Sequence, residues 1–243
     1  MLTPGNLKLG GRRIWGFALP SGRPDLCPGM SATCRAHCYA VALERYRPAA
    51  AARYRRNLLA SHRRDFTRQI IAFLVAHRVQ VVRIHTGGEF YSVKYARKWL
   101  RVIRRSQRVR FFFYSRCWRI PAIKAVIDRM AGQPNCVAWY SCDRDTGVPA
   151  GIPAGVRVAW LSISDDDVPA AGIDLVFRIR RLRRRPTPTG GTRVCPAEDG
   201  VQRPQHTTCD TCTRCWRRGR AVDRIPLPVI EESGGRDDTQ TSP

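Results

Sequence analysis

The sequence predicts an α/β fold, a partial or complete (β/α) TIM-like barrel with a C-terminal cysteine-rich metal-binding module. Three observations predict it. Apolar runs rich in β-branched and aromatic residues alternate with helix-like stretches, which is typical of a parallel sheet covered by helices. Polar residues follow successive predicted strands, as at the C-terminal mouth of a barrel. Four cysteines gather near the C-terminus, after a stretch rich in Pro, Thr and Gly.

The predicted strands and helices follow one another in a regular order. The first strand covers residues 13–19, and a loop with three cysteines follows it. The later strands are expected over 80–85, 110–114, 136–141, 157–163 and 174–179. Helices are expected over 34–46, 49–62, 65–77, 92–105 and 121–130. The first two helices are separated at Pro48, because proline cannot donate a backbone hydrogen bond.

Composition divides the chain into three parts. Residues 1–185 form the predicted barrel domain with its N-terminal cysteine loop. Residues 186–220 form a cysteine-rich cluster module that begins with a linker. Residues 221–243 are polar, and we expect this tail to be disordered.

The charge of the chain predicts a polyanionic partner. The 243 residues include 43 basic and 19 acidic ones, which gives a formal net charge of +24. Such an excess attracts polyanions, so we expect nucleic acid as the partner, DNA in preference to RNA. The densest basic run supplies the predicted phosphate-binding residues, namely Arg178, Arg180, Arg181, Arg183, Arg184 and Arg185.

Hydropathy and cysteine content predict the compartment. No segment reaches the roughly 18 apolar residues of a membrane span, and the N-terminus lacks the apolar run of a signal peptide. We therefore expect no membrane association and a cytoplasmic location. Thiols stay reduced there, so the ten cysteines indicate metal binding or catalysis rather than disulfides.

The C-terminal cysteines have the spacing of a metal centre. Cys195 precedes a proline, and Cys209, Cys212 and Cys215 follow at intervals of three residues. Zinc sites more often use two separate C-x2-C pairs. A contiguous triplet with a remote Cys-Pro is closer to the ligation of a [4Fe–4S] cluster. The spacing predicts such a cluster, with zinc as the alternative.

A second set of cysteines follows the first predicted strand. Cys34 and Cys38 lie one helical turn apart, so both thiolates can face one ligand. Gly29 permits the tight loop that brings Cys27 back toward them. These three cysteines are predicted to bind a second cluster or to join the C-terminal set. Three ligands would leave one iron open, by analogy with the open position of catalytic zinc sites.

Four polar residues at predicted strand ends are the candidate catalytic groups. His85 and Glu89 flank a Gly-Gly pair after the second strand, where they could relay protons or bind a cation. Arg116 follows the third strand and Asp143 the fourth, which adds a phosphate-binding fork and a second acid. Mg²⁺ or Mn²⁺ could bind the acids. The alternative is an ordinary set of turn and capping residues.

These motifs together resemble a phage-encoded family called gene product 88. The matching pieces are CPGMSATCRAHCYA at 27–40, RYRRN at 53–57, RIHTGGEFYS at 83–92 and the terminal CP…CDTCTRCW. The resemblance covers about residues 10 to 217 and implies a phage or prophage origin, in which case the expected location is the cytoplasm of the host cell.

A looser resemblance is to radical S-adenosylmethionine enzymes. Those place a three-cysteine loop after the first strand of a partial (β/α)6 barrel. A Gly-Gly-Glu element after their second strand holds the methionine amino group. Gly87, Gly88 and Glu89 are similar to that element. The cysteine loop is spaced C-x6-C-x3-C rather than C-x3-C-x2-C.

Taken together, the sequence predicts an iron–sulfur enzyme that acts on nucleic acid as a nuclease or a modifying enzyme. One alternative is a non-enzymatic nucleic-acid-binding protein with structural iron–sulfur or zinc. A second alternative is an enzyme of the radical S-adenosylmethionine kind.

Overall fold

A single large sheet forms the frame of the protein. The computed structural model describes residues 1–11, 13–167, 171–182, 194–196 and 207–218. In this part of the chain the sheet has seven strands in the order β1-β2-β3-β4-β5-β6-β7. β1 pairs antiparallel with β2, and all neighbouring pairs from β2 to β7 are parallel. The α/β class and the mostly parallel sheet expected from the sequence are confirmed.

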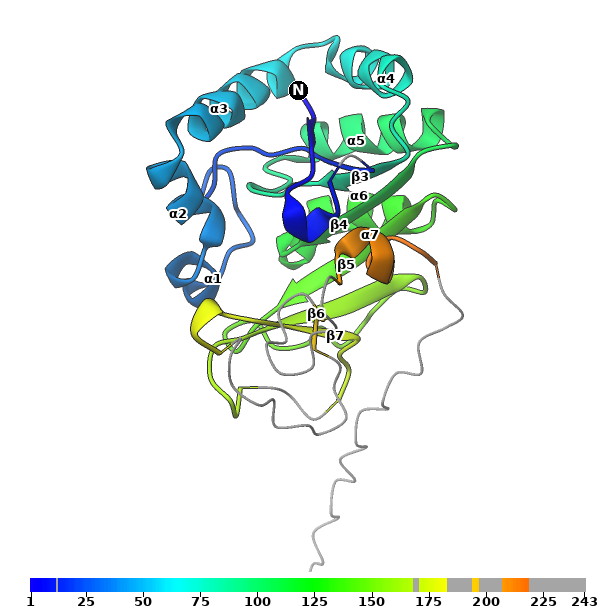
Figure 1. Ribbon diagram of the computed structural model, residues 1–243. Coiled ribbons are helices and arrows are strands. Elements are labelled where there is room, and N and C mark those ends of the chain that lie inside the picture. The colour runs from blue at the N-terminus through cyan, green and yellow to red at the C-terminus, as the bar shows by residue number, and fades with distance from the viewer. Residues whose placement is uncertain (12, 168–170, 183–193, 197–206, 219–243) are drawn as a thin grey trace, which may run out of the picture.

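The strands and helices lie close to their predicted positions. The strands are β1 (Thr3–Pro4), β2 (Ile14–Gly16), β3 (Val81–Ile84), β4 (Arg110–Ser115), β5 (Cys136–Cys142), β6 (Val156–Ser162) and β7 (Leu175–Arg178). The helices are α1 (Ala32–Ala36), α2 (Tyr39–Tyr46), α3 (Pro48–His62), α4 (Phe66–Ala76), α5 (Val93–Arg105), α6 (Pro121–Ala131) and α7 (Cys209–Cys212). Three 3₁₀ turns are η1 (Leu7–Leu9), η2 (Cys117–Arg119) and η3 (Arg180–Leu182). Helices join the strands from β2 to β5, whereas short connections lead on to β6 and β7 (Figure 1).

Local sequence signals fix where several helices begin. α3 and α6 each start at a proline, whose fixed φ and missing N–H suit the first helical turn. Ser92 caps α5, because its hydroxyl accepts a hydrogen bond from the Tyr95 amide at 3.2 Å. The predicted helix 34–46 is instead two helices, since Cys38 between them has an extended backbone (φ −69°, ψ 104°). That break lies within the cysteine loop.

The strands bury side chains on both faces of the sheet. In β4, Phe111 and Phe113 enter the core that packs against the helices, whereas Phe112 belongs to a second core on the opposite face. Leu9 of η1 and Trp216, just after α7, cover that second face. Figure 1 shows η1 and α7 on the side of the sheet opposite α5 and α6. The C-terminal cysteine module therefore packs directly on the sheet.

Some predictions fall beyond what the structure describes. β1 and β7 are the two edges of the described sheet, so a complete barrel is not seen in this part of the chain. An isolated parallel bridge from Val176 to Val194 places the segment before Cys195 beside β7. The predicted linker 186–192, the arginines Arg183, Arg184 and Arg185, and the tail 221–243 lie outside the described residues. No helix in the described ranges is both long and apolar enough to cross a bilayer.

Candidate active-site cavity and cysteine centres

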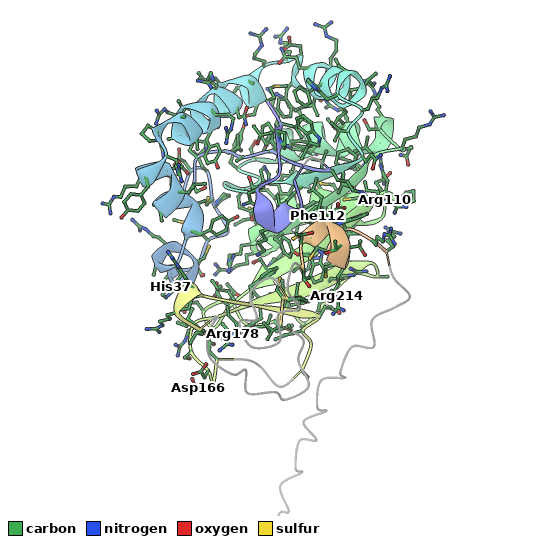
Figure 2. The ribbon with its side chains drawn as sticks, in the orientation of Figure 1. His37, Arg110, Phe112, Asp166, Arg178 and Arg214 are labelled. Carbon is green, nitrogen blue, oxygen red and sulfur yellow. The ribbon has the colours of Figure 1, made fainter. Side chains whose placement is uncertain are left out.

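The parallel strands bring the predicted functional residues to one edge of the sheet. The cysteine loop follows β2, while His85 follows β3, Arg116 follows β4 and Asp143 follows β5. Carboxyl ends of neighbouring parallel strands meet at the same edge, which explains the convergence. Figure 2 shows His37 of the cysteine loop and Arg178 of β7 on the same side of the molecule, with Arg110, at the start of β4, on the other.

A cavity of about 730 Å³ opens at this edge. Its lining includes all three cysteines of the loop, Cys27, Cys34 and Cys38. The strand ends contribute His85, Glu89, Arg116 and the paired glycines Gly87 and Gly88, and η3 contributes two arginines. The volume lies within the range of about 300–1,000 Å³ that is usual for small-molecule sites. The three cysteines and three of the four candidate catalytic residues therefore surround one space, whereas Asp143 is not among its lining residues.

The N-terminal cysteines lie close enough to affect each other's ionisation. Burial raises the pKa of Cys27 to about 12, and the neighbouring Glu89, Cys38 and Cys34 add to that rise. Burial also raises the pKa of Cys34, while Arg116 opposes the rise. Thiols in such a setting are protonated at neutral pH unless a cation replaces the proton. The donor set therefore fits a thiolate-bound metal centre.

Hydrogen bonds to the segment just after β5 hold the cysteine loop in place. Ser31 is the N-cap of α1: its hydroxyl accepts from the Cys34 amide at 2.9 Å and donates to Asp143 Oδ2 at 2.6 Å. The Thr33 amide donates to Asp145 Oδ2, also at 2.6 Å. Two carboxylates that follow β5 thus fix the helical turn that carries Cys34.

Asp143 also pairs with Arg116 inside the protein. Asp143 is fully buried, and its Oδ2 lies 3.0 Å from both Nε and Nη2 of Arg116. The amides of Asp145 and Thr146 donate to its other oxygen, at 3.1 and 3.3 Å. The carboxylate has little room left for a ligand, so its contacts make Asp143 a positioning residue for the cysteine loop.

Glu89 joins the ends of β3 and β4. Its Oε2 accepts from the Arg116 amide at 2.6 Å, from the Ser115 hydroxyl at 2.8 Å and from the Cys117 amide at 3.3 Å. Its Oε1 accepts from the Phe90 amide. Burial raises the pKa of Glu89, and these hydrogen bonds oppose that rise by favouring the charged form. The side chain borders the cavity, but its main contacts are with backbone amides.

His85 is a neutral, buried side chain with one free nitrogen. Its Nε2 forms a 2.9 Å hydrogen bond with the Tyr95 hydroxyl, and its Nδ1 has no hydrogen-bond partner. Glu89 Oε1 is 3.9 Å from that Nδ1. Burial lowers the pKa of His85 to about 3, so the imidazole is uncharged at neutral pH. The backbone of His85 has a positive φ of 62°, which turns the chain sharply as β3 ends.

The predicted phosphate-binding arginines differ in exposure. Arg178 is 2 % exposed, and its Nη2 lies 2.9 Å from Asp165 Oδ1, so we assign it to holding the cavity rim rather than to direct phosphate contact. Arg180 and Arg181 are exposed and also line the cavity. Arg181 donates to the Ile163 carbonyl at 3.0 Å.

The C-terminal cysteines gather at a second, smaller site against β7. All four of Cys195, Cys209, Cys212 and Cys215 line one hollow. Burial raises the pKa of Cys215 to about 12, and the other three thiols add to that rise. The Trp139 indole of β5 donates to the Cys215 carbonyl at 3.0 Å. The four predicted ligands are therefore neighbours, and their all-sulfur chemistry fits a cluster or zinc.

The metal centres themselves remain a prediction. In the described ranges no group of three or more His, Cys, Asp or Glu side chains is already arranged around a single ion position. The other three cysteines, Cys117, Cys136 and Cys142, are fully buried in the main core, as expected for packed thiols. The sequence spacing thus separates the clustered cysteines from the packed ones.

Sequence reasoning missed several residues that build the site. Ser31 could have been found, because serine three residues before Cys34 is a capping signal. Asn57, the last residue of the RYRRN motif, is buried on α3 and does not face solvent; its amide donates to the Ala18 carbonyl at 2.9 Å, which fixes the segment that leads to the cysteine loop. Tyr39 lies within the CPGMSATCRAHCYA motif, but the sequence assigned no role to its aromatic side chain, which lines the cavity.

Comparisons with known proteins agree with this arrangement of motifs. A family model described as Gene product 88 matches residues 2–218. The Gene 88 protein of Mycobacterium phage L5 is 34% identical over 151 residues, 56% of this chain and 62% of the relative. The Gene 88 protein of Mycobacterium phage D29 is 33% identical over 151 residues, 56% of this chain and 61% of the relative. The matched region thus spans about three fifths of these relatives. No solved structure matches the chain.

Proposed function

The chain belongs to the Gene product 88 family, and we propose that it is an iron–sulfur enzyme that modifies nucleic acid. One observation carries the proposal: Cys27, Cys34 and Cys38 line a cavity of about 730 Å³ that exposed arginines also border. A cluster with three cysteine ligands offers an open iron to a substrate or cofactor atom. The arginines and the net charge of +24 favour a polyanionic substrate. A reducing host cytoplasm is the compartment that keeps such thiols available.

The carboxylates favour modification over metal-assisted hydrolysis. A nuclease that uses Mg²⁺ or Mn²⁺ holds the ion with free carboxylates at the reacting phosphate. Asp143 is fully buried in its pair with Arg116, and Glu89 accepts four hydrogen bonds, three of them from backbone amides. We assign these residues to positioning the cysteine loop and the strand ends. His85, which lines the cavity and has a buried Nδ1 without a hydrogen-bond partner, is the candidate for moving a proton.

The C-terminal cysteines have a different role in this proposal. Four protein thiolates fill the ligand positions of a cubane, so that cluster has no open iron. Cys195 and Trp216 belong to the core on the second sheet face. The site therefore serves structure or electron transfer, with zinc as the alternative occupant.

The test uses anaerobically purified full-length protein and single- and double-stranded DNA and RNA. Reactions with a reductant, and with or without Mg²⁺ or Mn²⁺, are digested to nucleosides and analysed by mass spectrometry. We expect a modified nucleoside with wild type and with Cys136→Ala, whose thiol is packed in the core, and none with Cys34→Ala. Binding without any product would favour the non-enzymatic alternative. A Cys34→Ala variant as active as wild type would refute the proposal.

A second candidate is an S-adenosylmethionine-dependent radical reaction on a partial (β/α) barrel. Six parallel strands in sequential order, with the cysteine loop after the first and Gly87-Gly88 after the second, favour it. Both glycines line the cavity beside the cysteines. A reduced protein given S-adenosylmethionine should then release 5′-deoxyadenosine. Absence of that product from a fully loaded, reducible cluster counts against this candidate and leaves the first one standing.

A further inference from the structure

The size of the cavity limits which form of nucleic acid can reach the cysteines. A space of about 730 Å³ is the size of a pocket for one small ligand. A stacked base pair in a duplex cannot enter such a pocket, because its neighbours above and below hold it in place. Enzymes that act on a base in a pocket of this kind take the nucleotide out of the stack. The reacting nucleotide must therefore be unstacked.

Tyr39 offers an aromatic surface at the mouth of this cavity. It is the first residue of α2, directly after Cys38, and it is 60% exposed. Its hydroxyl donates to the Thr86 carbonyl and accepts from Arg83 Nη2 at 3.4 Å. The ring is thus held in position by its tip while much of its surface remains open. Base stacking on such a ring costs little conformational entropy.

Cations from two elements far apart in the sequence line the same opening. Arg35 of α1 is exposed and lines the cavity on the side of the cysteine loop. Arg180 and Arg181 of η3 are exposed and line it from the end of β7. Figure 1 shows α1 and η3 next to each other at this end of the molecule. Guanidinium groups in these places can contact the phosphates on either side of an inserted nucleotide.

We propose that the cavity binds one unstacked nucleotide of a single-stranded nucleic acid. A base of the strand stacks on Tyr39, and the flanking phosphates contact Arg35, Arg180 and Arg181. This inference rests on the proposed function and adds the form of the substrate. Tyr39 contributes base stacking to binding, and the arginines contribute charge. The two contributions respond differently to substitution and to salt.

α2 provides a matched pair of tyrosines for the test. Tyr46, the last residue of the helix, is 74% exposed and does not line the cavity. Binding of the full-length protein is measured by fluorescence anisotropy with a labelled single-stranded DNA, its RNA counterpart and the matching blunt duplex. We expect at least one single strand to bind more tightly than the duplex, and the stronger of the two identifies the sugar.

The expected effect of Tyr39→Ala is a roughly 5- to 150-fold weaker affinity for the preferred single strand, the usual range for one lost stacking contact. Its affinity for the duplex should change less than about twofold, and Tyr46→Ala should match wild type for every probe. Arg35→Gln should lower the slope of log affinity against log salt by about 1, whereas Tyr39→Ala should leave that slope unchanged.

Two outcomes would overturn the inference, and only the second would also refute the proposed function. Equal binding of single strand and duplex, with Tyr39→Ala indistinguishable from Tyr46→Ala, refutes the unstacked nucleotide but leaves a nucleic-acid enzyme possible. Failure of wild type to bind any of the three probes refutes the inference together with the proposed function.

Discussion

Substitution of Asp143 tests whether the cysteine loop depends on a buried ion pair. Asp143 has no exposed surface, and the Arg116 side chain it pairs with is only 12% exposed. The Asp143→Ala variant removes both contacts to Arg116 and the 2.6 Å hydrogen bond from Ser31. The guanidinium would then stay buried without its counter-ion, which is the costly way to break such a pair.

The expected loss is about 3–5 kcal/mol in the free energy of unfolding, the usual cost of leaving one buried charge unpaired. For a chain of this length each kcal/mol corresponds to about 2–4 °C, so Tm should fall by about 6–20 °C. Denaturant titration of anaerobically purified protein, followed by tryptophan fluorescence and circular dichroism, measures the change. Removing Arg116 as well, in Asp143→Ala/Arg116→Met, should recover part of the loss because no charge is left buried.

An exposed pair of the same chemistry supplies the control. Arg23 and Asp25 also form two hydrogen bonds, but their side chains are 66% and 57% exposed. Asp25→Ala should therefore cost no more than about 1 kcal/mol. If Asp143→Ala were no more destabilising than Asp25→Ala, the Asp143–Arg116 pair would not hold the cysteine loop, and the positioning role assigned to Asp143 would be wrong.

Three further predictions follow from other buried contacts. Because burial lowers the pKa of His85 to about 3, only the unfolded chain takes up a proton at this residue as the pH falls below about 6.5. The unfolding free energy of wild type should therefore fall, relative to that of His85→Gln, between about pH 7 and about pH 4. A difference between the two that stays constant over this range would contradict the prediction. Lys98 Nζ of α5 donates to the backbone carbonyls of Ser61 and Arg63, at the C-terminal end of α3, at 2.7 Å each. Lys98→Met should therefore cost about 1.5–3 kcal/mol in denaturant titrations, whereas Lys94→Met, at an exposed position of α5, should not. A Cβ at Gly29 would lie 2.3 Å from the Arg116 carbonyl oxygen. Gly29→Ala should therefore displace the cysteine loop and roughly halve the iron bound per protein. An unchanged iron content would show that the loop holds no cluster.

Much of the fold could be predicted from the chain because its elements carry local signals. The stretch 121–130, with proline at its first position, is α6 (Pro121–Ala131), and the aromatic run 110–114 is β4 (Arg110–Ser115). Proline, β-branched residues and apolar periodicity act within a few residues of themselves. The short β1 (Thr3–Pro4) was missed, because its pairing with β2 depends on a partner rather than on its own sequence.

The residues of the candidate site could be predicted from the sequence, but the contacts between them could not. Sequence order placed His85, Glu89, Arg116 and Asp143 at strand ends, and the structure brings them to one edge of the sheet. The orientation of Glu89 toward the backbone amides just after β4 depends on register between strands, which no single motif encodes. The break at Cys38 likewise depends on how the loop packs. Such features arise from tertiary contacts.

Metal content distinguishes an iron–sulfur protein from a zinc protein or a metal-free one. Iron, acid-labile sulfide and zinc should be measured on anaerobically purified full-length protein, together with an ultraviolet–visible spectrum. We predict a brown protein that absorbs near about 400 nm and holds about eight irons, four at each cysteine site, as cubane stoichiometry requires. In Cys212→Ala the iron should fall to about four, with the cavity cluster retained. A colourless protein that carries zinc, or no metal, would contradict the iron–sulfur account.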